Sequence, residues 1–219
     1  MQKKATEFSL VVVGNMPTTL FTPQWLLNHG LLSKTEADNA KIHVISPKIT
    51  SFDIAEWGKL EIRPDRLVFG TVSDSHHEII KDIVLSLITA VEGNELNFLG
   101  VNFTYHFTVS ENDYLDIGRK LAPFENWANI ISNPKMERIE MVQEERSDGH
   151  KGKVRIRVQP SRLIEKLGVE FRINNHFERV GVADQSSKEF INLLNNFWFE
   201  AQDEANKKFN FFLTNLDIT

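Results

Sequence analysis

The sequence contains no cysteine, so disulfides, thiol nucleophiles and cysteine-based zinc sites are excluded. It also lacks an apolar run near the roughly 18 residues that a membrane-spanning helix requires. The apolar stretch that follows the first residues is too short for a signal peptide. Together these absences predict a cytoplasmic protein that does not associate with a membrane.

Recognisable motifs for nucleotide binding and catalysis are missing as well. The sequence has no Walker A loop, no Gly-x-Gly-x-x-Gly turn after a strand and no Gly-x-Ser-x-Gly elbow. The adjacent histidines His76 and His77 are spaced wrongly for a shared metal ion, because neighbouring helical positions point about 100° apart. We therefore expect no cofactor and no metal site, and an enzyme only if dispersed Asp, Glu and His residues converge, as in a hydrolase or nuclease.

Positive charge is in deficit. The chain has 25 lysines and arginines against 30 aspartates and glutamates, a formal net charge of −5. Proteins that bind nucleic acid without sequence preference usually present a basic surface that displaces counterions. The overall balance therefore counts against nucleic acid as a partner.

Hydrophobic residues make up 41% of the chain, and in two stretches they recur at the spacing of an amphipathic helix. Residues 76–92 and residues 187–212 each place an apolar stripe along one side. Ser75 and Glu78 form the pattern of a capping box ahead of the first stretch, and the second stretch repeats that pattern. The sequence therefore predicts two long helices with capped N-termini.

Predicted strands precede both helices. Residues 97–109 alternate apolar and polar side chains over a long span, and Asp148-Gly149 marks a hairpin turn between residues 136–145 and 151–159. A shift of 111 positions superimposes the starts of the two long helices, which indicates an internal duplication. Further strands are predicted at residues 8–13, 42–45, 59–62, 66–72 and 168–177, and short helices near residues 23–28 and 113–129.

This order of elements predicts an α+β protein in which an antiparallel sheet packs under long helices. We expect two similar halves, each β-α-β(3–4)-α, that share a core. The first half covers residues 8–95 and the second covers residues 96–219, after a flexible tail at residues 1–7.

The element order resembles the tandem TATA-binding-protein-like fold and, more loosely, the helix-grip fold. The resemblance covers nearly the whole chain and involves no diagnostic motif. The segment Leu99-Gly100-Val101-Asn102-Phe103 is also similar to a strand in a sporadically distributed family of uncharacterised bacterial proteins. Neither resemblance implies an activity, because fold alone does not determine function.

A polar face of the second-half sheet is the first candidate binding surface. In residues 151–159, lysines and arginines alternate with Val154, Ile156 and Val158, so the basic side chains should point away from the core. Such a surface suits an acidic partner, a phosphate-bearing ligand or nucleic acid. The pattern favours a solvated face with cross-strand partners such as Glu140, because antiparallel sheets often leave one face in water. The candidate residues are Asn102, Thr104, His106, Arg155, Arg157 and Arg172.

The end of the last helix is the second candidate surface. A continuous helix from residue 187 to 213 would be roughly 40 Å long, and its final turns are apolar on more than one side. It either spans both halves as a core helix or packs against a second subunit. The candidate oligomer contacts are Phe209, Phe211 and Phe212.

These observations predict a non-enzymatic binding or assembly protein that acts through protein–protein contacts as a homodimer. The first alternative is a protein that binds a small anionic ligand in a pocket between the long helix and the sheet. The second is an unrecognised hydrolase or nuclease.

Overall fold

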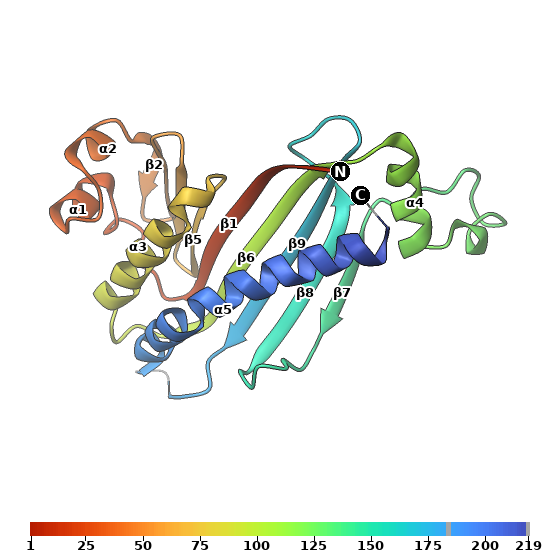
Figure 1. Cartoon of the computed structure of the whole chain (residues 1–219). Helices are drawn as coiled ribbons and strands as arrows, with labels where there is room; N and C mark the ends of the chain where they lie inside the picture. Colours follow the sequence, from red (N-terminus) through yellow and green to blue (C-terminus); the bar gives the residue numbers. More distant parts are fainter. Residues whose placement is uncertain (183–184, 218–219) are drawn as a thin grey trace.

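The computed structural model describes residues 1–182 and 185–217, and within these residues it forms one nine-stranded antiparallel sheet with helices on one face (Figure 1). The strands are β1 (Gln2–Gly14), β2 (Lys41–Ser46), β3 (Ile49–Ile54), β4 (Gly58–Arg63), β5 (Arg66–Thr71), β6 (Leu96–Thr108), β7 (Ile139–Gln143), β8 (Gly152–Pro160) and β9 (Gly168–Glu178). The helices are α1 (Pro23–Asn28), α2 (Lys34–Asp38), α3 (His77–Ala90), α4 (Glu111–Leu121) and α5 (Ser186–Asn215). The α+β class is confirmed.

The strand order in the sheet is β2-β3-β4-β5-β1-β6-β9-β8-β7. The two long strands β1 and β6 lie side by side at the centre and pair antiparallel along most of their length. The hydrophobic core is one continuous cluster with residues from both sides of this central pair.

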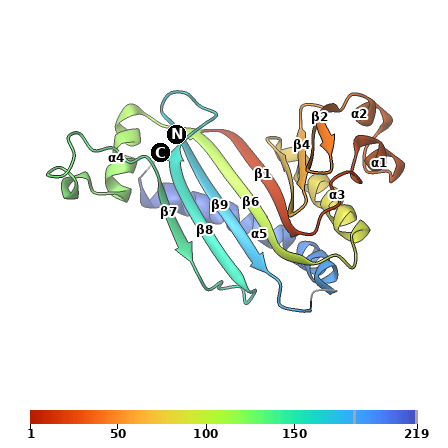
Figure 2. The ribbon, with the colours of Figure 1, turned by 180° about the vertical axis from the view of Figure 1, so that it is seen from behind.

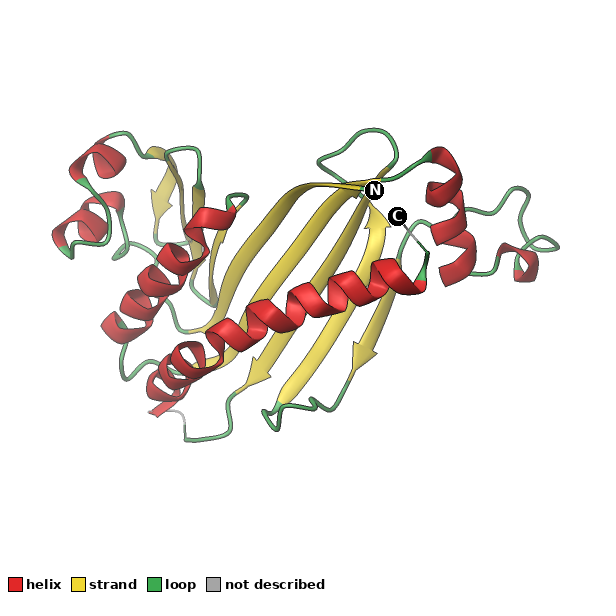
Figure 3. Ribbon diagram, in the orientation of Figure 1, coloured by secondary structure: helices red, strands yellow, loops and turns green. Residues whose placement is uncertain are grey.

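The two long helices cover the same face of the sheet (Figure 3). Helix α3 packs against β1 and β5, and helix α5 packs against β6, β9 and α3. The predicted apolar stripe of α3 is buried, with Ile80 and Val84 fully inaccessible. On α5, the Trp198 ring meets the Phe8 ring of β1 edge-on at 5.1 Å. We call the side of the sheet without these helices the open face. It is turned toward the viewer in Figure 2.

Residues 1–7 were predicted to be a flexible tail, and this prediction is wrong. Strand β1 begins at Gln2, which pairs with Thr108, and Glu7 pairs with Thr104. The long strand β6 offers a backbone edge that reaches as far as Thr108, so the first residues of the chain gain hydrogen-bond partners by extending along it.

The predicted capping boxes do not form. A 3₁₀ turn precedes α3, whose N-cap residue His76 makes no side-chain capping bond. At the start of α5, the Ser186 hydroxyl accepts the N–H of Leu96 at 3.0 Å, which ties the helix to the central strand. Glu189 instead accepts the N–H groups of Val180 and Gly181 at 2.8 and 2.9 Å. At the start of α5, hydrogen bonds to residues outside the helix have replaced the predicted capping bonds.

His77, the first residue of α3, is buried against the core. It is 4% exposed, its ring centroid lies 4.8 Å from that of Phe8, and neither ring nitrogen has a hydrogen-bond partner among the described residues. Burial lowers the pKa of His77, and the Asp74 carboxylate 3.8 Å away only partly offsets this. The folded protein therefore favours the neutral ring.

The pH dependence of stability should reflect this burial. As the pH falls below the unfolded pKa of 6.5, the unfolded chain takes up a proton that the folded chain refuses, so the free energy of unfolding decreases. The loss continues until the pH reaches the folded pKa, at about 1.4 kcal/mol per unit of pKa difference. We expect His77→Phe to flatten this slope between about pH 7 and pH 5. Urea denaturation across this range measures it, and equal slopes in both proteins would contradict the burial effect.

Candidate functional site

The sequence-predicted binding residues all lie on strands of the open face. Arg155 and Arg157 come from β8, and Arg172 comes from β9. Their neighbours Val154, Val158, Phe171 and Ile173 are buried on the helical side, so the alternation of the strands directs the arginines away from the core. Asn102, Thr104 and His106 alternate in the same way on β6 with Val101, Phe103, Tyr105 and Phe107.

The three arginines meet around one small pocket. Arg157 lies directly opposite Arg172, and Arg155 lies directly opposite Asn174. With Glu140 of β7, these four residues line a hollow of about 230 Å³, which we call the arginine pocket. Like charges on directly opposite strand positions normally repel, so this pairing is not explained by stability of the sheet.

Among the described residues, only Arg157 of these three makes a hydrogen bond or ion pair with a carboxylate. Arg157 donates to Glu140 from Nε at 2.7 Å, and its Nη2 lies 2.6 Å from the same carboxylate oxygen. This hydrogen bond holds the pKa of the Glu140 carboxyl below its ordinary value. Arg155 and Arg172 make no hydrogen bond or ion pair with any described residue. The arginine pocket therefore carries an excess of positive charge.

Arg172 is the more constrained of the two unpaired arginines. It is half-buried, and burial lowers the pKa of its guanidinium; the adjacent charge of Arg157 lowers it further, while Glu170 partly offsets both. A guanidinium nevertheless stays protonated in proteins. A desolvated cation without a partner is unfavourable for folding, and an incoming anion would relieve this cost.

A chain of amides positions the floor of the arginine pocket. Asn102, 2% exposed, donates from Nδ2 to the backbone oxygen of Ser9 at 3.3 Å. Its side-chain oxygen accepts a hydrogen bond from Nδ2 of Asn174. An amide nitrogen carries two hydrogens, and the second N–H of Asn174 has no acceptor among the described residues. Asn102 thus acts on the pocket only through Asn174.

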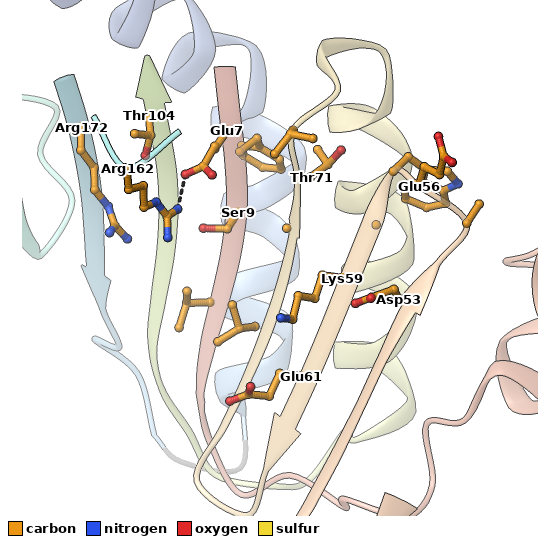
Figure 4. A pocket seen from close by; sticks show the side chains of 18 of the residues that line it. Glu7, Ser9, Asp53, Glu56, Lys59, Glu61, Thr71, Thr104, Arg162 and Arg172 are labelled. Atoms are coloured by element: carbon orange, nitrogen blue, oxygen red, sulfur yellow. Dashed lines mark hydrogen bonds and ion pairs between the residues drawn. The ribbon is translucent and has the colours of Figure 1, made fainter. Parts of the chain in front are cut away.

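A wider groove of about 760 Å³ adjoins the arginine pocket and shares Arg172 with it (Figure 4). Arg162 and Arg172 stand on one side of this groove, whereas Asp53 and Glu56 stand on the other. Thr104 also lines the groove. The groove could hold the remainder of a ligand whose anionic group occupies the arginine pocket.

His106 belongs to neither hollow, because the segment between β8 and β9 covers it. The ring is fully buried, and its Nδ1 lies 2.8 Å from the hydroxyl oxygen of Ser161. Its Nε2 lies 3.4 Å from Glu7, in a contact too poorly aligned for a hydrogen bond. Burial alone would raise the pKa of the Glu7 carboxyl, but the contacts with His106 and Arg162 outweigh it and lower the pKa.

Ser161, His106 and Glu7 follow the order of a hydrolase triad, but their contacts fit a structural role. The Ser161 hydroxyl already accepts the N–H groups of Leu163 and Ile164 at 3.1 Å each, which holds the turn after β8. A general base must reach a proton on the reacting group, and His106 has no exposed surface. The cluster therefore secures the covering segment onto the sheet.

The helical side of the sheet is filled with aromatic side chains. The rings of Phe209 and Tyr105 stack with centroids 4.3 Å apart, and Phe212 packs half-buried against Phe171. Phe209 is 5% exposed, so it has little surface for a second subunit, whereas Phe211 is 67% exposed. The arginine pocket and the groove lie on the opposite face from the pocket that was predicted between helix and sheet.

The part of the chain that the structure describes contains no group of three or more His, Asp or Glu residues arranged to hold a metal ion. None of its helices combines the length and the apolar character needed to cross a membrane. Sequence reasoning missed Glu7, Ser161 and Arg162, because no local pattern connects the start of the chain with the turn between β8 and β9. Comparison with models of known protein families and with curated proteins finds no match to this chain.

Proposed function

We propose that this chain is a binding protein without catalytic activity, and that its arginine pocket holds an anionic group of its ligand. The observation that carries this proposal is that the guanidiniums of Arg155 and half-buried Arg172, beside Asn174, form no hydrogen bond or ion pair with any residue that the structure describes. Guanidinium groups bind phosphate and carboxylate through paired hydrogen bonds. The pocket volume of about 230 Å³ suits one such group.

Two features favour a small ligand or an acidic protein segment over nucleic acid. The net charge of −5 opposes a polyanion. Stacking platforms for bases require aromatic rings that are free to receive them, whereas Phe98 of the open face is already stacked on His176 at 4.9 Å. The shared groove supplies room for the remainder of the ligand.

Titration calorimetry with pyrophosphate tests this function. Charge-assisted hydrogen bonds contribute about 1.5–3 kcal/mol, so we expect Arg172→Gln to weaken binding roughly tenfold to a hundredfold. Arg119→Gln on α4 is the control, because Arg119 pairs with Asp116 and lines neither hollow. Equal affinities in the two variants, or no binding by the unmodified protein, would reject the proposal.

Protein stability supplies an independent readout. No carboxylate of the described chain pairs with Arg172, so Arg172→Gln should leave the urea midpoint unchanged or raise it. Residues kept for binding often cost stability. A clear loss of stability would mean that Arg172 serves the fold instead.

We further propose that the fold consists of two duplicated halves in a TATA-binding-protein-like arrangement. The strand order supports this, since β1 and β6 open their halves and meet at the centre, while β5 and β9 flank them and lead into α3 and α5. The second half would lack a counterpart of β2. Superposition of the halves in an experimental structure tests the proposal, and divergent Cα paths of the paired strands and helices would exclude it.

A further inference from the structure

Strand β7 forms one end of the sheet and leaves an open edge. Its residues pair with β8, from Ile139 opposite Val158 to Gln143 opposite Val154, and no described strand pairs with its other side. Met141 is 65% exposed and Val142 is 42% exposed. Such an edge presents unpaired backbone N–H and C=O groups and is a template for another strand.

Over residues 138–144 the charges along this edge are complementary to themselves. In an antiparallel pair of two β7 strands centred on Met141, Arg138 stands opposite Glu144 of the partner subunit, and Ile139 stands opposite Gln143 of the partner subunit. One position further out, beyond these residues, exposed Glu137 stands opposite Glu145 of the partner subunit. The two-fold axis generates the Arg138–Glu144 pair twice. We propose that a second copy of this chain adds to the sheet here, which joins two sheets into one continuous sheet across a two-fold axis.

Over the same residues, 138–144, other registers are less favourable. A centre at Glu140 places that carboxylate opposite itself, and a centre at Val142 places Arg138 opposite Arg146 of the partner subunit. Like charges directly opposite each other destabilise a sheet. A shift by one residue instead turns the apolar side chains to the other face. In the Met141 register Glu144 exchanges its contact with Lys153, 3.7 Å away, for Arg138 of the partner subunit.

Exposed apolar residues beside β7 add to the surface that a second copy would bury. A five-residue strand pair alone falls short of the roughly 1,000 Å² that specific interfaces bury. Next to the strand, Trp127 and Ile131 are 49% and 51% exposed, and they line a hollow that includes Arg138. The antiparallel partner strand would run past this hollow. The other sheet edge, β2, carries Lys41 and His43 but no carboxylate, so it lacks this self-complementarity.

Cysteine cross-linking tests the register directly, because the natural chain contains no thiol. Directly opposite residues of an antiparallel pair have Cα atoms about 4.5–5.5 Å apart, within the range of a disulfide. We expect Met141→Cys to form a covalent dimer under mild oxidation. Gln143→Cys, exposed on the same strand, should not, since its two copies would lie roughly 13 Å apart.

Charge reversal tests the same interface without a cross-linking reaction. Arg138→Glu and Glu144→Arg should each weaken the dimer in sedimentation equilibrium at least several-fold, and the double variant should restore it. A monomer for the unmodified chain at high micromolar concentration would overturn the proposal. Equal cross-linking of the two cysteine variants, or failure of the double variant to recover, would overturn it as well.

Discussion

Replacing Phe209 by alanine is expected to lower the free energy of unfolding by about 3–5 kcal/mol, the range for a buried phenylalanine. The Phe209 ring is one of the points where α5 contacts the centre of the sheet. It stacks on Tyr105 with an interplanar angle of 3° and lies 5.4 Å from Phe107 and 5.6 Å from Phe171. Its removal leaves a cavity that these rings can only partly fill.

Phe211→Ala is the matched control, two residues along the same helix. Phe211 is 67% exposed, so its truncation should change stability by less than about 0.5 kcal/mol. Urea denaturation of both variants measures the difference. Similar losses in the two variants would mean that α5 does not pack as described. If Phe211→Ala instead lowered the molecular mass of the assembly in solution, this ring would be an oligomer contact, as predicted from the sequence.

The second large effect is expected at Arg146, in the turn of the β7–β8 hairpin. Its side chain is 2% exposed, and its guanidinium lies 3.9 Å from the Phe177 ring centroid. It forms a bidentate pair with Asp148, donating from Nε at 3.0 Å and also from Nη2. Arg146→Ala removes the aromatic packing and the ion pair, and leaves Asp148 with only the N–H of His150, so we expect a loss of about 2–3 kcal/mol.

Two further variants separate the charge from the packing. Arg146→Met with Asp148→Asn keeps the apolar bulk and removes both charges, and it should recover much of the loss. Arg63→Ala breaks the exposed pair with Glu61 and should cost at most about 1 kcal/mol. The urea denaturation midpoints of these variants separate the contribution of charge from that of packing. If Arg146→Ala were as mild as Arg63→Ala, the hairpin would not depend on the contacts of Arg146 with Asp148 and Phe177.

Secondary structure was predictable wherever a long periodic pattern met a local signal. The predicted helix at residues 23–28 matches α1, and the alternation of residues 97–109 matches β6 to within a residue at each end. Strand β3 was missed, because its sequence Ile-Thr-Ser-Phe-Asp-Ile buries polar as well as apolar side chains between two neighbours. The paired tail was missed because its partner strand lies about a hundred residues away.

The candidate site was predictable as a face but not as a pocket. Alternation alone places Arg155 and Arg157 on the same side of β8. Only the strand register shows that Glu140 neutralises Arg157 while Arg155 faces an amide. Likewise, the sequence grouped His106 with the arginines, yet the segment after β8 buries it beside Ser161. Pairing between distant strands decides which side chains remain available to a ligand.

An anion between Arg155 and Arg172 is the feature on which the proposed function depends, and crystallography can locate it directly. Crystals of the unmodified protein soaked in tungstate are expected to show anomalous density in the arginine pocket, in contact with both guanidiniums and with Asn174. Density only at exposed lysines, with Arg172 held by a carboxylate of its own chain, would contradict the proposed binding site.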